Sequence, residues 1–371
     1  MTMRINGRVS GLVVAAVVVL ALVAGAFPAG ATHFDAKARA EFVKALEEAK
    51  KIEGNKLIGY DHQPNYANWG GVQKFFTEKY GLIWPPDMKS SVTAMAALIA
   101  EQANPQASVV YYNAAIGSQA AERGLHEPYK PKGWELIPPE HKDPDGKWFN
   151  IHYGTIAFVI NMKALERTKV PVPKCWSDLV KPEYKNLVAY DDPTVQGTAF
   201  DAIFTALWVH GGTYDNLRPG IEYLKKLHPN IISYNKETSY NPSLRGEIPI
   251  WLHADGSGYK MKHHDRGPVE VVIPCEGTTV FPLNMALVKG APTPRLAKLT
   301  LDWLNTEEAQ RVFAESFFRP IHPGALTPEI EAKMKPLHGS YDNIKPYDLR
   351  RKVKMVDEYK KAWVEEVRRA R

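Results

Sequence analysis

The first 31 residues constrain this chain more than any other segment. Residues 12–27 form a strongly apolar run, preceded by Arg4 and Arg8 and followed by small residues at 29–31. Basic residues before a short apolar core and small residues after it are typical of a cleaved export signal. A helix needs ~20 apolar residues to span a bilayer, so a retained membrane anchor is the weaker interpretation. We therefore expect residues 1–31 to be removed and the mature chain to work outside the cytoplasm.

The length of the mature chain predicts two folding units. Removing 31 of the 371 residues leaves 340, which exceeds the ~250–300 residues at which one hydrophobic core usually stops growing. The signal carries two arginines and no acid, so the formal net charge falls from +6 to +4. The sequence has no basic stripe interleaved with aromatic residues, the pattern of nucleic-acid-binding proteins. We therefore expect no nucleic-acid partner.

Two cysteines, Cys175 and Cys275, remain in the mature chain. In an oxidising compartment they could pair, and closing so long a loop would stabilise the fold by roughly 4 kcal/mol through chain entropy. Two separately buried thiols are an equally good interpretation, because spacing along the sequence does not give their distance in space. Neither cysteine belongs to a C-x-x-C motif, so zinc binding and dithiol redox chemistry are not indicated.

Helical and strand patterns alternate along the first half of the mature chain. Helical patterns lie at 35–51, 69–80 and 93–103, and β-rich runs at 57–61 and 108–112. A charged segment with five prolines, 127–147, predicts a surface excursion. This alternation predicts an α/β fold in which a mostly parallel sheet is flanked by helices.

A second alternation follows in the second half. Predicted strands lie at 155–161, 187–190, 231–234, 248–252, 269–273 and 280–288, and predicted helices at 198–209, 219–227, 294–304 and 307–315. Near the C-terminus, one helical face carries Val353, Val356, Tyr359, Trp363 and Val367. We interpret the lysines and arginines on the opposite face as solvated.

Local signatures of catalysis are absent from the sequence. It contains no H-E-x-x-H, no G-x-x-x-x-G-K-[ST] and no G-x-G-x-x-G motif. Ser257 lacks the glycine two positions earlier that a nucleophile elbow requires. The run from His263 to Asp265 could suggest a metal cluster, but adjacent side chains point in different directions, which favours a surface turn. We therefore expect no enzyme activity, no metal and no cofactor.

One turn has a mechanism for binding an anion. Residues 191–199 follow a predicted strand and open an apolar helix. Free N–H groups at a helix start favour negative charge, and a glycine lets a ligand approach the backbone. Gly197 and Thr198 are therefore candidates for gripping an anionic group. Ordinary capping by an Asp or Thr oxygen would explain the same turn.

Further candidates follow other predicted strands, where α/β sheets place their ligands. Tyr60, Asp61 and His62 end the first strand, Tyr111, Tyr112 and Asn113 end the next, and Asp255 follows a later one. Their shared position relative to the strands is the argument, since each residue alone is more often packed or capping. We select as ligand-binding candidates Tyr60, Asp61, His62, Tyr112, Asn113 and Asp255.

Three segments together resemble a known family. Residues 170–185, with Asp192-Pro193 and Gly197-Thr198 behind them, match the pattern vP-x-sW-x-DL-x-x-P-x-yk…dP…GT. The second segment is 272–277, followed by 283–290, 297–304 and Ala309-Gln310. The third is Tyr153-Gly154, which leads into 158–161. The chain thus resembles the periplasmic solute-binding proteins of ABC importers, in the group that serves ferric ion, polyamines, thiamine, phosphonates and sugar phosphates. We add Tyr153 to the ligand-binding candidates.

The resemblance implies a two-lobed, type II periplasmic-binding-protein-like fold that holds solute in a cleft by hinge closure. The first lobe would comprise 32–152 plus 279–315, the second 153–278, and residues 316–371 would form C-terminal helices packing on the lobes. It further implies a periplasmic monomer that delivers a small charged solute to an ABC permease in the inner membrane.

The kind of solute is less constrained. Ferric members of the group carry a tyrosine pair where this chain reads His253-Ala254-Asp255, which argues against iron held in that manner. Polyamine binders use carboxylates and aromatic walls, which Asp61 or Asp255 with Tyr60 and Trp69 could supply, but Asn284 stands where their pattern has an acid. We favour a solute with an anionic group held at Gly197 and Thr198. A cationic group on it could pair with Asp61 or Asp255.

Two rival functions remain open from the sequence. An exported two-lobed enzyme could place Asp255 and a histidine such as His62 in the cleft as acid and base. A binding protein of the same fold could instead engage a sensor, because the physics of closure would be the same.

Overall fold

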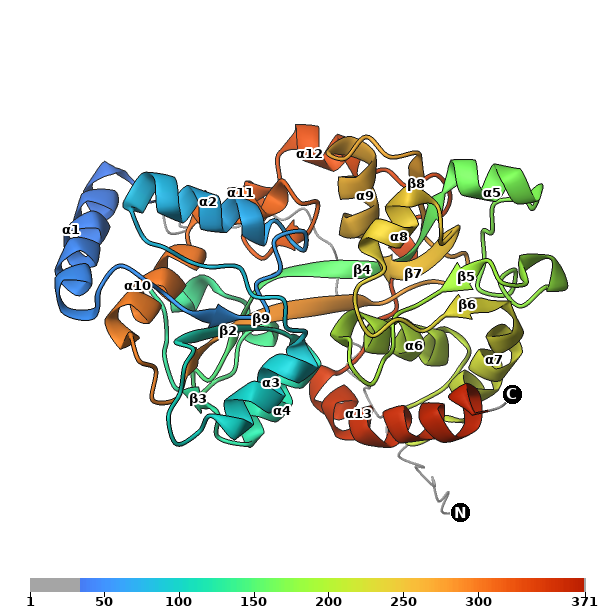
Figure 1. The fold of residues 1–371 in the computed structure, drawn as a ribbon, viewed down its shortest axis with the longest axis horizontal. Helices are drawn as coiled ribbons and strands as arrows, with labels where there is room; N and C mark the ends of the chain where they lie inside the picture. Colours follow the sequence, from blue (N-terminus) through green and yellow to red (C-terminus); the bar gives the residue numbers. More distant parts are fainter. Residues whose placement is uncertain (1–33, 370–371) are drawn as a thin grey trace, which may run out of the picture.

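Two α/β lobes lie side by side along the long axis of the molecule, with β4 and β9 running between them (Figure 1). The structure is a computed structural model and describes residues 34–369. The predicted export signal at 1–31 lies outside the described residues. Within 34–369, no helix combines the length and apolar character needed to cross a bilayer.

The first lobe is built around strands near the N-terminus and the return strand β9. Its strands are β1 (Gly59–Tyr60), β2 (Val109–Asn113), β3 (His126–Glu127), β9 (Val280–Val288), β10 (Arg319–Pro320) and the first half of β4 (Phe149–Asn161). Its helices are α1 (Ala36–Glu53), α2 (Trp69–Tyr80), α3 (Ser91–Ala100), α4 (Ala114–Glu122), α10 (Pro294–Leu304) and α11 (Glu307–Ala314).

The second lobe contains the other half of β4. Its further strands are β5 (Val188–Ala189), β6 (Ile231–Ser233), β7 (Ile250–Ala254) and β8 (Val269–Val272). Its helices are α5 (Met162–Thr168), α6 (Gly197–Val209), α7 (Arg218–Leu227), α8 (Tyr240–Arg245) and α9 (Asp255–His263). The chain ends with α12 (Pro328–Lys333), α13 (Leu349–Ala362) and a π-helical continuation, Trp363–Arg368.

Strand β4 is the structural link between the two sheets. Its residues 149–155 pair with β9, and its residues 156–161 pair with β7 and β8. All of these pairings are antiparallel, as is β2 with β9. The parallel pairs are β1 with β2, and β5 with both β6 and β7. The sheets are therefore mixed, and the expectation of mostly parallel sheets was wrong in this detail because the crossing strands run against their neighbours.

The regular patterns of the sequence predicted several elements well. The expected ranges 69–80, 280–288 and 294–304 coincide with α2, β9 and α10. The helix expected at 93–103 begins earlier, at Ser91. Helices α4 and α9 were not predicted, because both are buried on more than one side and therefore lack the polar face that gives an amphipathic pattern.

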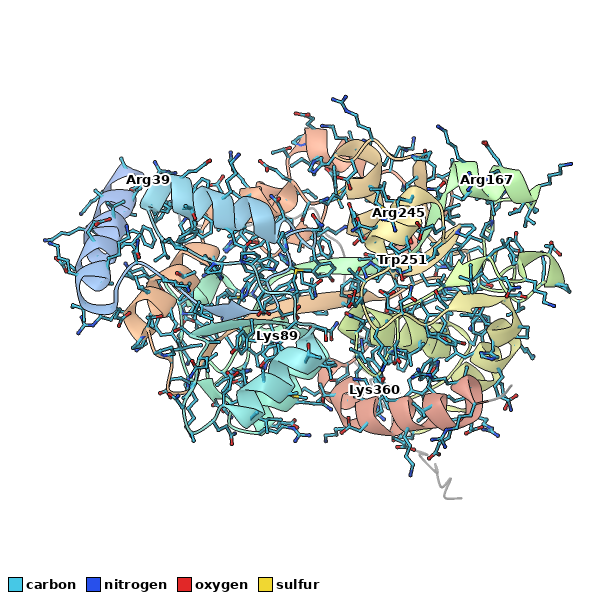
Figure 2. All side chains as sticks on the ribbon, in the orientation of Figure 1. Arg39, Lys89, Arg167, Arg245, Trp251 and Lys360 are labelled. Carbon is cyan, nitrogen blue, oxygen red and sulfur yellow. A yellow bond between two sulfur atoms is a disulfide. The ribbon has the colours of Figure 1, made fainter. Side chains whose placement is uncertain are left out.

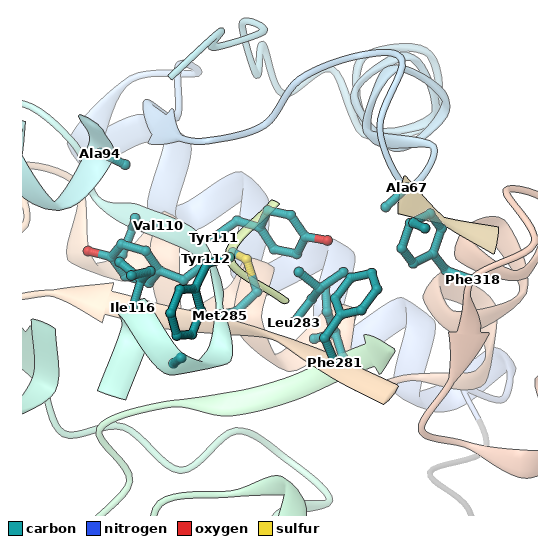
Figure 3. Packing of buried hydrophobic residues seen from close by; sticks show 14 of the residues in the cluster. Ala67, Ala94, Val110, Tyr111, Tyr112, Ile116, Phe281, Leu283, Met285 and Phe318 are labelled. Carbon is teal, nitrogen blue, oxygen red and sulfur yellow. The ribbon is translucent and has the colours of Figure 1, made fainter. Parts of the chain in front are cut away.

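The buried face of β2 and β9 packs against α4. Tyr112 from β2 and Ile116 from α4 lie close together in this core (Figure 3), whereas Met285 pairs with Tyr111 on the opposite face of the sheet. On the other side of the same strands, Leu283 and Tyr111 face the space between the lobes. The first lobe therefore presents one side of its sheet to its own core and the other to the cleft.

The predicted apolar face of the C-terminal helix is confirmed. Its five residues, from Val353 to Val367, are buried, and α13 packs against α4 while the following turn contacts α7. In Figure 1 this helix lies along the lower edge of the second lobe and reaches the first. The basic residues are not all solvated, however, since Lys352 is fully buried.

The two cysteines form a disulfide. Cys175 and Cys275 are bonded, with their Cα atoms 4.8 Å apart. The next residue, Glu276, accepts hydrogen bonds from the backbone N–H groups of Trp176 and Ser177, at 2.7 and 2.9 Å. Of the two alternatives left by the sequence, pairing is confirmed, and the bond ties the segment around 175 to the strand that returns to the first lobe.

Candidate functional site

A cleft of about 420 Å³, including the part open to solvent, lies between the lobes. The first lobe contributes Asp61, Gln63, Tyr66, Ser90, Ser91, Tyr111, Asn113 and Leu283 to its walls, and the second lobe contributes Asp191, Gln196, Gly197, Thr198, Thr238 and His253. Among these described lining residues, none is a lysine or an arginine. Any charge selectivity toward an anion must therefore come from dipoles and hydroxyl groups.

Three helices begin at this cleft. Helix α3 starts at Ser91, α4 starts directly after Asn113, and α6 starts at Gly197. A Cβ atom on Gly197 would lie 2.7 Å from the Cβ of Asn113 and 3.4 Å from the Ser91 Oγ. All three N-termini therefore meet at one point, and only a glycine permits α6 to come this close. Helix N-termini carry partial positive charge and unpaired N–H donors.

The start of α6 is open to a ligand. Gln196 is the N-cap residue and makes no side-chain capping hydrogen bond. Nearby, the Asp192 Oδ1 instead accepts from the Thr194 N–H and hydroxyl, at 2.9 and 2.5 Å. The capping alternative considered for this turn is thus not how the structure uses Asp192 and Thr194. The first two residues of α6, Gly197 and Thr198, line the cleft, and the N-cap side chain does not bond their N–H groups.

The two lobes already touch across the cleft. The Tyr66 hydroxyl from the first lobe and the Thr198 Oγ1 from the second are 3.1 Å apart. The Ser90 hydroxyl donates to the backbone oxygen of Val195 at 2.8 Å. These bonds can form only while the lobes are close together, so the arrangement corresponds to a closed state.

Asp61 is held rigidly in the first wall. Its φ of 63° lies in the left-handed region, which is uncommon for a residue other than glycine. Its N–H donates to the Asp87 Oδ1 at 2.9 Å, and its Oδ2 accepts from the Ser91 hydroxyl at 2.7 Å. Burial raises the pKa of the Asp61 carboxyl well above its ordinary value, although the bond from Ser91 opposes this shift. Uncommon backbone conformations of this kind cluster at functional sites.

Asp191 and His253 line the second wall. Burial raises the pKa of the Asp191 carboxyl to about 7, against hydrogen bonds from Ser239 that lower it. Burial also lowers the pKa of the His253 imidazole to about 3. The His253 ring stacks on Trp251, with centroids 3.7 Å apart. Near neutral pH this wall therefore carries a neutral imidazole and a carboxyl group that is partly protonated.

The structure brings four of the predicted residues together in the cleft: Asp61, Asn113, Gly197 and Thr198. It places Tyr60 and His62 elsewhere. The Tyr60 hydroxyl donates to the Glu101 carboxylate at 2.8 Å, and Lys89 lies 3.9 Å from the centre of its ring. The His62 ring is buried against Trp69, with centroids 4.2 Å apart. Burial lowers the pKa of His62 to about 3.

The tyrosine that lines the cleft is Tyr111, and Tyr112 does not. Successive strand residues point to opposite faces, and the two tyrosines of β2 do so (Figure 3). The Tyr112 ring packs against His126, with centroids 5.5 Å apart. All five residues of β2 are buried, so burial on both faces hides the alternation that could have distinguished the two.

Tyr153 and Asp255 also lie outside the lining of the cleft. The Tyr153 ring stacks on His141, with centroids 6.3 Å apart. The Asp255 Oδ1 accepts from the N–H groups of Thr155 and Gly256, at 3.0 and 2.9 Å. Its Oδ2 accepts from Arg319 and from the Tyr341 hydroxyl, both at 2.8 Å. The pairing of Asp255 with His62 that an enzyme would need is therefore not assembled in this cleft.

Several lining residues were not among the selected candidates. They are Gln63, Tyr66, Ser90, Ser91, Tyr111, Asp191, Gln196, Thr238, His253 and Leu283. A signal for Ser90 and Ser91 was present, since serine is a preferred N-cap residue, Ser90 caps α3 and Ser91 is the first residue of that helix. The helix expected at 93–103 begins two residues after the true start at Ser91, so it does not include either serine.

One group of described residues has the spacing of metal ligands. It consists of Cys175, Cys275 and Glu276, whose ligand atoms lie within 4.8 Å of one another. The two sulfurs are joined in the disulfide, so they are not available as thiolates. This group therefore does not fit a metal ion.

Comparison with known proteins identifies the family. The model of the bacterial extracellular solute-binding proteins matches residues 104–346, which is more than half of the chain. The protein therefore belongs to this family, and the resemblance found in the sequence is confirmed.

Individual relatives agree with this assignment. An uncharacterized protein of Haemophilus influenzae is 35% identical over 253 residues, covering 64% of this chain and 70% of its own. The spermidine/putrescine-binding periplasmic protein of Salmonella typhimurium is 27% identical over 183 residues, which is 49% of each chain. The alignment thus spans about half of that relative.

Solved structures show the same two-lobed fold. The periplasmic binding protein AfuA from Actinobacillus pleuropneumoniae, solved with exogenous fructose-6-phosphate bound, has a TM-score of 0.73 and 27% identity. The match covers 85% of this chain and 99% of that one. The expected α/β periplasmic-binding-protein fold is confirmed.

Proposed function

We propose that the protein is the periplasmic substrate-binding component of an ABC importer and captures a small solute that carries an anionic group. A phosphonate, a phosphate ester or a carboxylate would fit. The observation that supports this most directly is the convergence of the N-termini of α3, α4 and α6 on one cleft. The dipoles of all three helices favour negative charge at such a position, and α6, whose N-cap residue makes no side-chain capping bond, also offers N–H donors to a phosphate or carboxylate group.

Hydroxyl groups complete the anion site. Ser91 and Thr198 lie beside the start of α6, and Tyr66 reaches Thr198 from the opposite lobe. A solute placed there would contact both lobes only when they close, so binding would stabilise the closed state. The closed form would then be the form delivered to the membrane permease.

The remainder of the solute would face two carboxyl groups. Asp61 and Asp191 line the cleft from opposite lobes. A carboxyl group can accept hydrogen bonds from sugar hydroxyls or pair with an ammonium group. The relative AfuA, solved with fructose-6-phosphate, supports a solute that combines an anionic group with hydrogen-bonding groups.

A polyamine is the second candidate. Two aspartates and two tyrosines in the walls, together with the absence of lysine and arginine from the described lining, favour a cation over an anion in simple charge terms. The relationship to a spermidine/putrescine-binding protein supports this candidate as well. The helix N-termini oppose it, because they place partial positive charge in the same space.

Location, assembly and the absence of catalysis belong to the same proposal. The relatives are periplasmic binding proteins, which supports cleavage of residues 1–31 and a mature periplasmic protein. We further propose that it acts as a monomer, without a cofactor and without turnover of its solute. Incubation of an identified solute with the protein, followed by mass analysis of the solute, tests the last point.

A thermal-shift panel with matched ligands tests the choice of solute. Fructose 6-phosphate is compared with fructose, ethylphosphonate with ethanol, and spermidine is measured alone. We expect the phosphorylated and phosphonate compounds to raise the melting temperature and their uncharged partners not to. Stabilisation by spermidine alone would support the polyamine candidate and contradict the anion proposal.

A substitution at the helix start locates the site. In Thr198→Asp a carboxylate stands where the anion is proposed to lie, while an acid in the first turn of α6 is favourable for the helix itself. We expect anion binding to be lost and the ligand-free melting temperature to be retained. Thr306→Asp, at the N-cap of α11 outside the cleft, is the matched control and should bind normally.

A further inference from the structure

Lys352 of α13 forms an ion pair with Asp201 of α6 inside the protein. The exposed fraction of the side chain is 1% for Lys352 and 0% for Asp201. The ammonium group also lies 4.2 Å from the ring centre of Phe204 and 4.6 Å from that of Tyr347. A lysine so deeply buried is rare unless it has a partner, and here the partner is a carboxylate next to the proposed solute site.

Asp201 connects this lysine to the cleft. It lies one turn after Gly197 in α6, and its Oδ2 accepts a hydrogen bond from the Asn113 side chain of the other lobe. The Oδ1 of Asn113 accepts from the Ala115 N–H at 3.1 Å and so caps α4. Asn113 lines the cleft. The carboxylate that Lys352 holds therefore orients an amide between the starts of α4 and α6.

The same helix supplies other counter-charges to this region. Arg368 lies 2.8 Å from the Oδ2 of Asp192, in the turn that precedes α6. Lys360, labelled in Figure 2, lies on α13 between these two basic residues in sequence. The cleft lining itself contains no lysine or arginine among the described residues. The basic partners of Asp201 and Asp192 therefore come from α13 and its continuation.

We propose that Lys352 is a positioning residue that sets the charge preference of the solute site. By pairing with Asp201 it cancels a negative charge one turn behind the start of α6, and it fixes the carboxylate that aims the Asn113 amide. The start of α6 can then accept an anion. This inference rests on the proposed capture of an anionic solute at that helix.

Removing the charge of Lys352 and removing the charge of Asp201 should have opposite effects on the binding of an anion. A bare Asp201 carboxylate would repel an anion at Gly197, because unit charges a few ångströms apart interact strongly where water is scarce. Removing the Asp201 charge would instead leave the lysine to attract the anion. A pair with only a structural role would weaken binding in the same direction whichever partner was changed.

The test measures binding of fructose 6-phosphate and ethylphosphonate by calorimetry to the wild type and four variants. They are Lys352→Met, Asp201→Asn, the double variant and Lys354→Met, whose side chain is exposed on the same helix. We expect Lys352→Met to weaken binding of the tighter probe by about tenfold or more. Asp201→Asn should bind at least as tightly as the wild type. The double variant should recover most of the loss, and Lys354→Met should be unchanged.

The affinities of these variants decide whether Lys352 sets the charge preference of the site. Equal affinities of the folded Lys352→Met and wild-type proteins, or weaker binding by Asp201→Asn and Lys352→Met alike, would overturn the role of Lys352. If Lys352→Met does not fold, Asp201→Asn and the double variant still separate the two cases. Failure of the wild type to bind either probe would instead overturn the anion proposal itself, and the inference with it.

Discussion

Two buried aspartates, Asp255 and Asp201, face similar environments and have different relations to the cleft. Each is fully buried, and each pairs with a basic residue from the last part of the chain, Arg319 or Lys352. Asp255 was selected from the sequence as a ligand-binding candidate, and Asp201 was not.

The difference lies in what else their oxygens bind. Both oxygens of Asp255 are occupied by groups around the point where β4 passes between the sheets: the Thr155 and Gly256 N–H groups, Arg319 and Tyr341. The Oδ2 of Asp201 accepts a hydrogen bond from the Asn113 side chain across the cleft. A buried acid whose bonds are all made away from the cleft supports the architecture. One that bonds across a closing cleft can also respond to a ligand.

The largest expected effect is on stability at Asp255. Asp255→Asn leaves Arg319, whose side chain is 14% exposed, without its carboxylate, so we expect the free energy of unfolding in urea to fall by about 3–5 kcal/mol. Affinity of the folded protein for solute should stay within about twofold, because Asp255 does not line the cleft. A large loss of affinity at nearly unchanged stability would make Asp255 a ligand after all. The double variant with Arg319→Met should recover part of the stability.

The next effect concerns closure at Gly197. A Cβ there would meet Asn113 at 2.7 Å, and such overpacking costs about 1–3 kcal/mol in the closed state. We therefore expect Gly197→Ala to weaken solute binding roughly 5- to 150-fold while the ligand-free protein keeps its melting temperature. Calorimetry measures the affinity for solute and the melting temperature, and scattering on ligand-saturated protein measures the closure of the lobes. Gly324→Ala, whose Cβ would meet nothing within 4 Å, is the control, and equal affinities would show that closure does not need Gly197.

A smaller effect is the pH dependence contributed by Asp191. Burial raises the pKa of this carboxyl from 3.8 to about 7, so between these values the folded protein holds a proton that the unfolded chain releases. The stability from this group is complete below about pH 4 and is lost as the pH rises through 7. Asp191→Asn should therefore reduce the fall in unfolding free energy between pH 5 and pH 8 by about 2–3 kcal/mol. Parallel pH profiles of the two proteins would contradict the shift.

The smallest expected effect is at the hydrogen bond between Tyr66 and Thr198. Thr198→Val keeps the shape and removes one partner of a bond that joins the lobes. We expect a loss of about 1 kcal/mol in solute binding, roughly fivefold. Tyr66→Phe should behave similarly, and the double variant should lose less than the sum of the two. Additive losses would mean that the bond does not contribute to closure.

Prediction from the sequence worked where a single local pattern controlled the outcome. Helix α2 and strand β9 have the expected bounds because their spacing of apolar residues is regular. The turn at Gly197 and Thr198 was predicted as a binding site because a glycine and free N–H groups at a helix start favour a bound anion, and this pattern can be recognised from neighbouring residues alone. Asp61 and Asn113 were found by their position at strand ends, and both line the cleft.

Prediction failed where burial was uniform or the partner was distant. The sequence did not show which of Tyr111 and Tyr112 lines the cleft, because β2 is buried on both faces. Lys352 was assigned to a solvated face because basic residues at helical spacing usually are solvated, whereas its partner lies 151 positions earlier in the chain. Sequence neighbours carry no information about such a contact.

The sequence by itself determined the family, the bounds of α2, β9 and α10, and the turn that opens α6. The family follows from the resemblance of three segments, and the helices, the strand and the turn follow from local periodicity and glycine geometry, which act over a few residues. Only the tertiary structure decided that Cys175 pairs with Cys275, that Asp255 is tied to Arg319, and that Asp201 joins Lys352 to the cleft. Such contacts depend on how the two lobes and α13 pack, and distances between residues more than 60 positions apart are set by that packing rather than by sequence spacing.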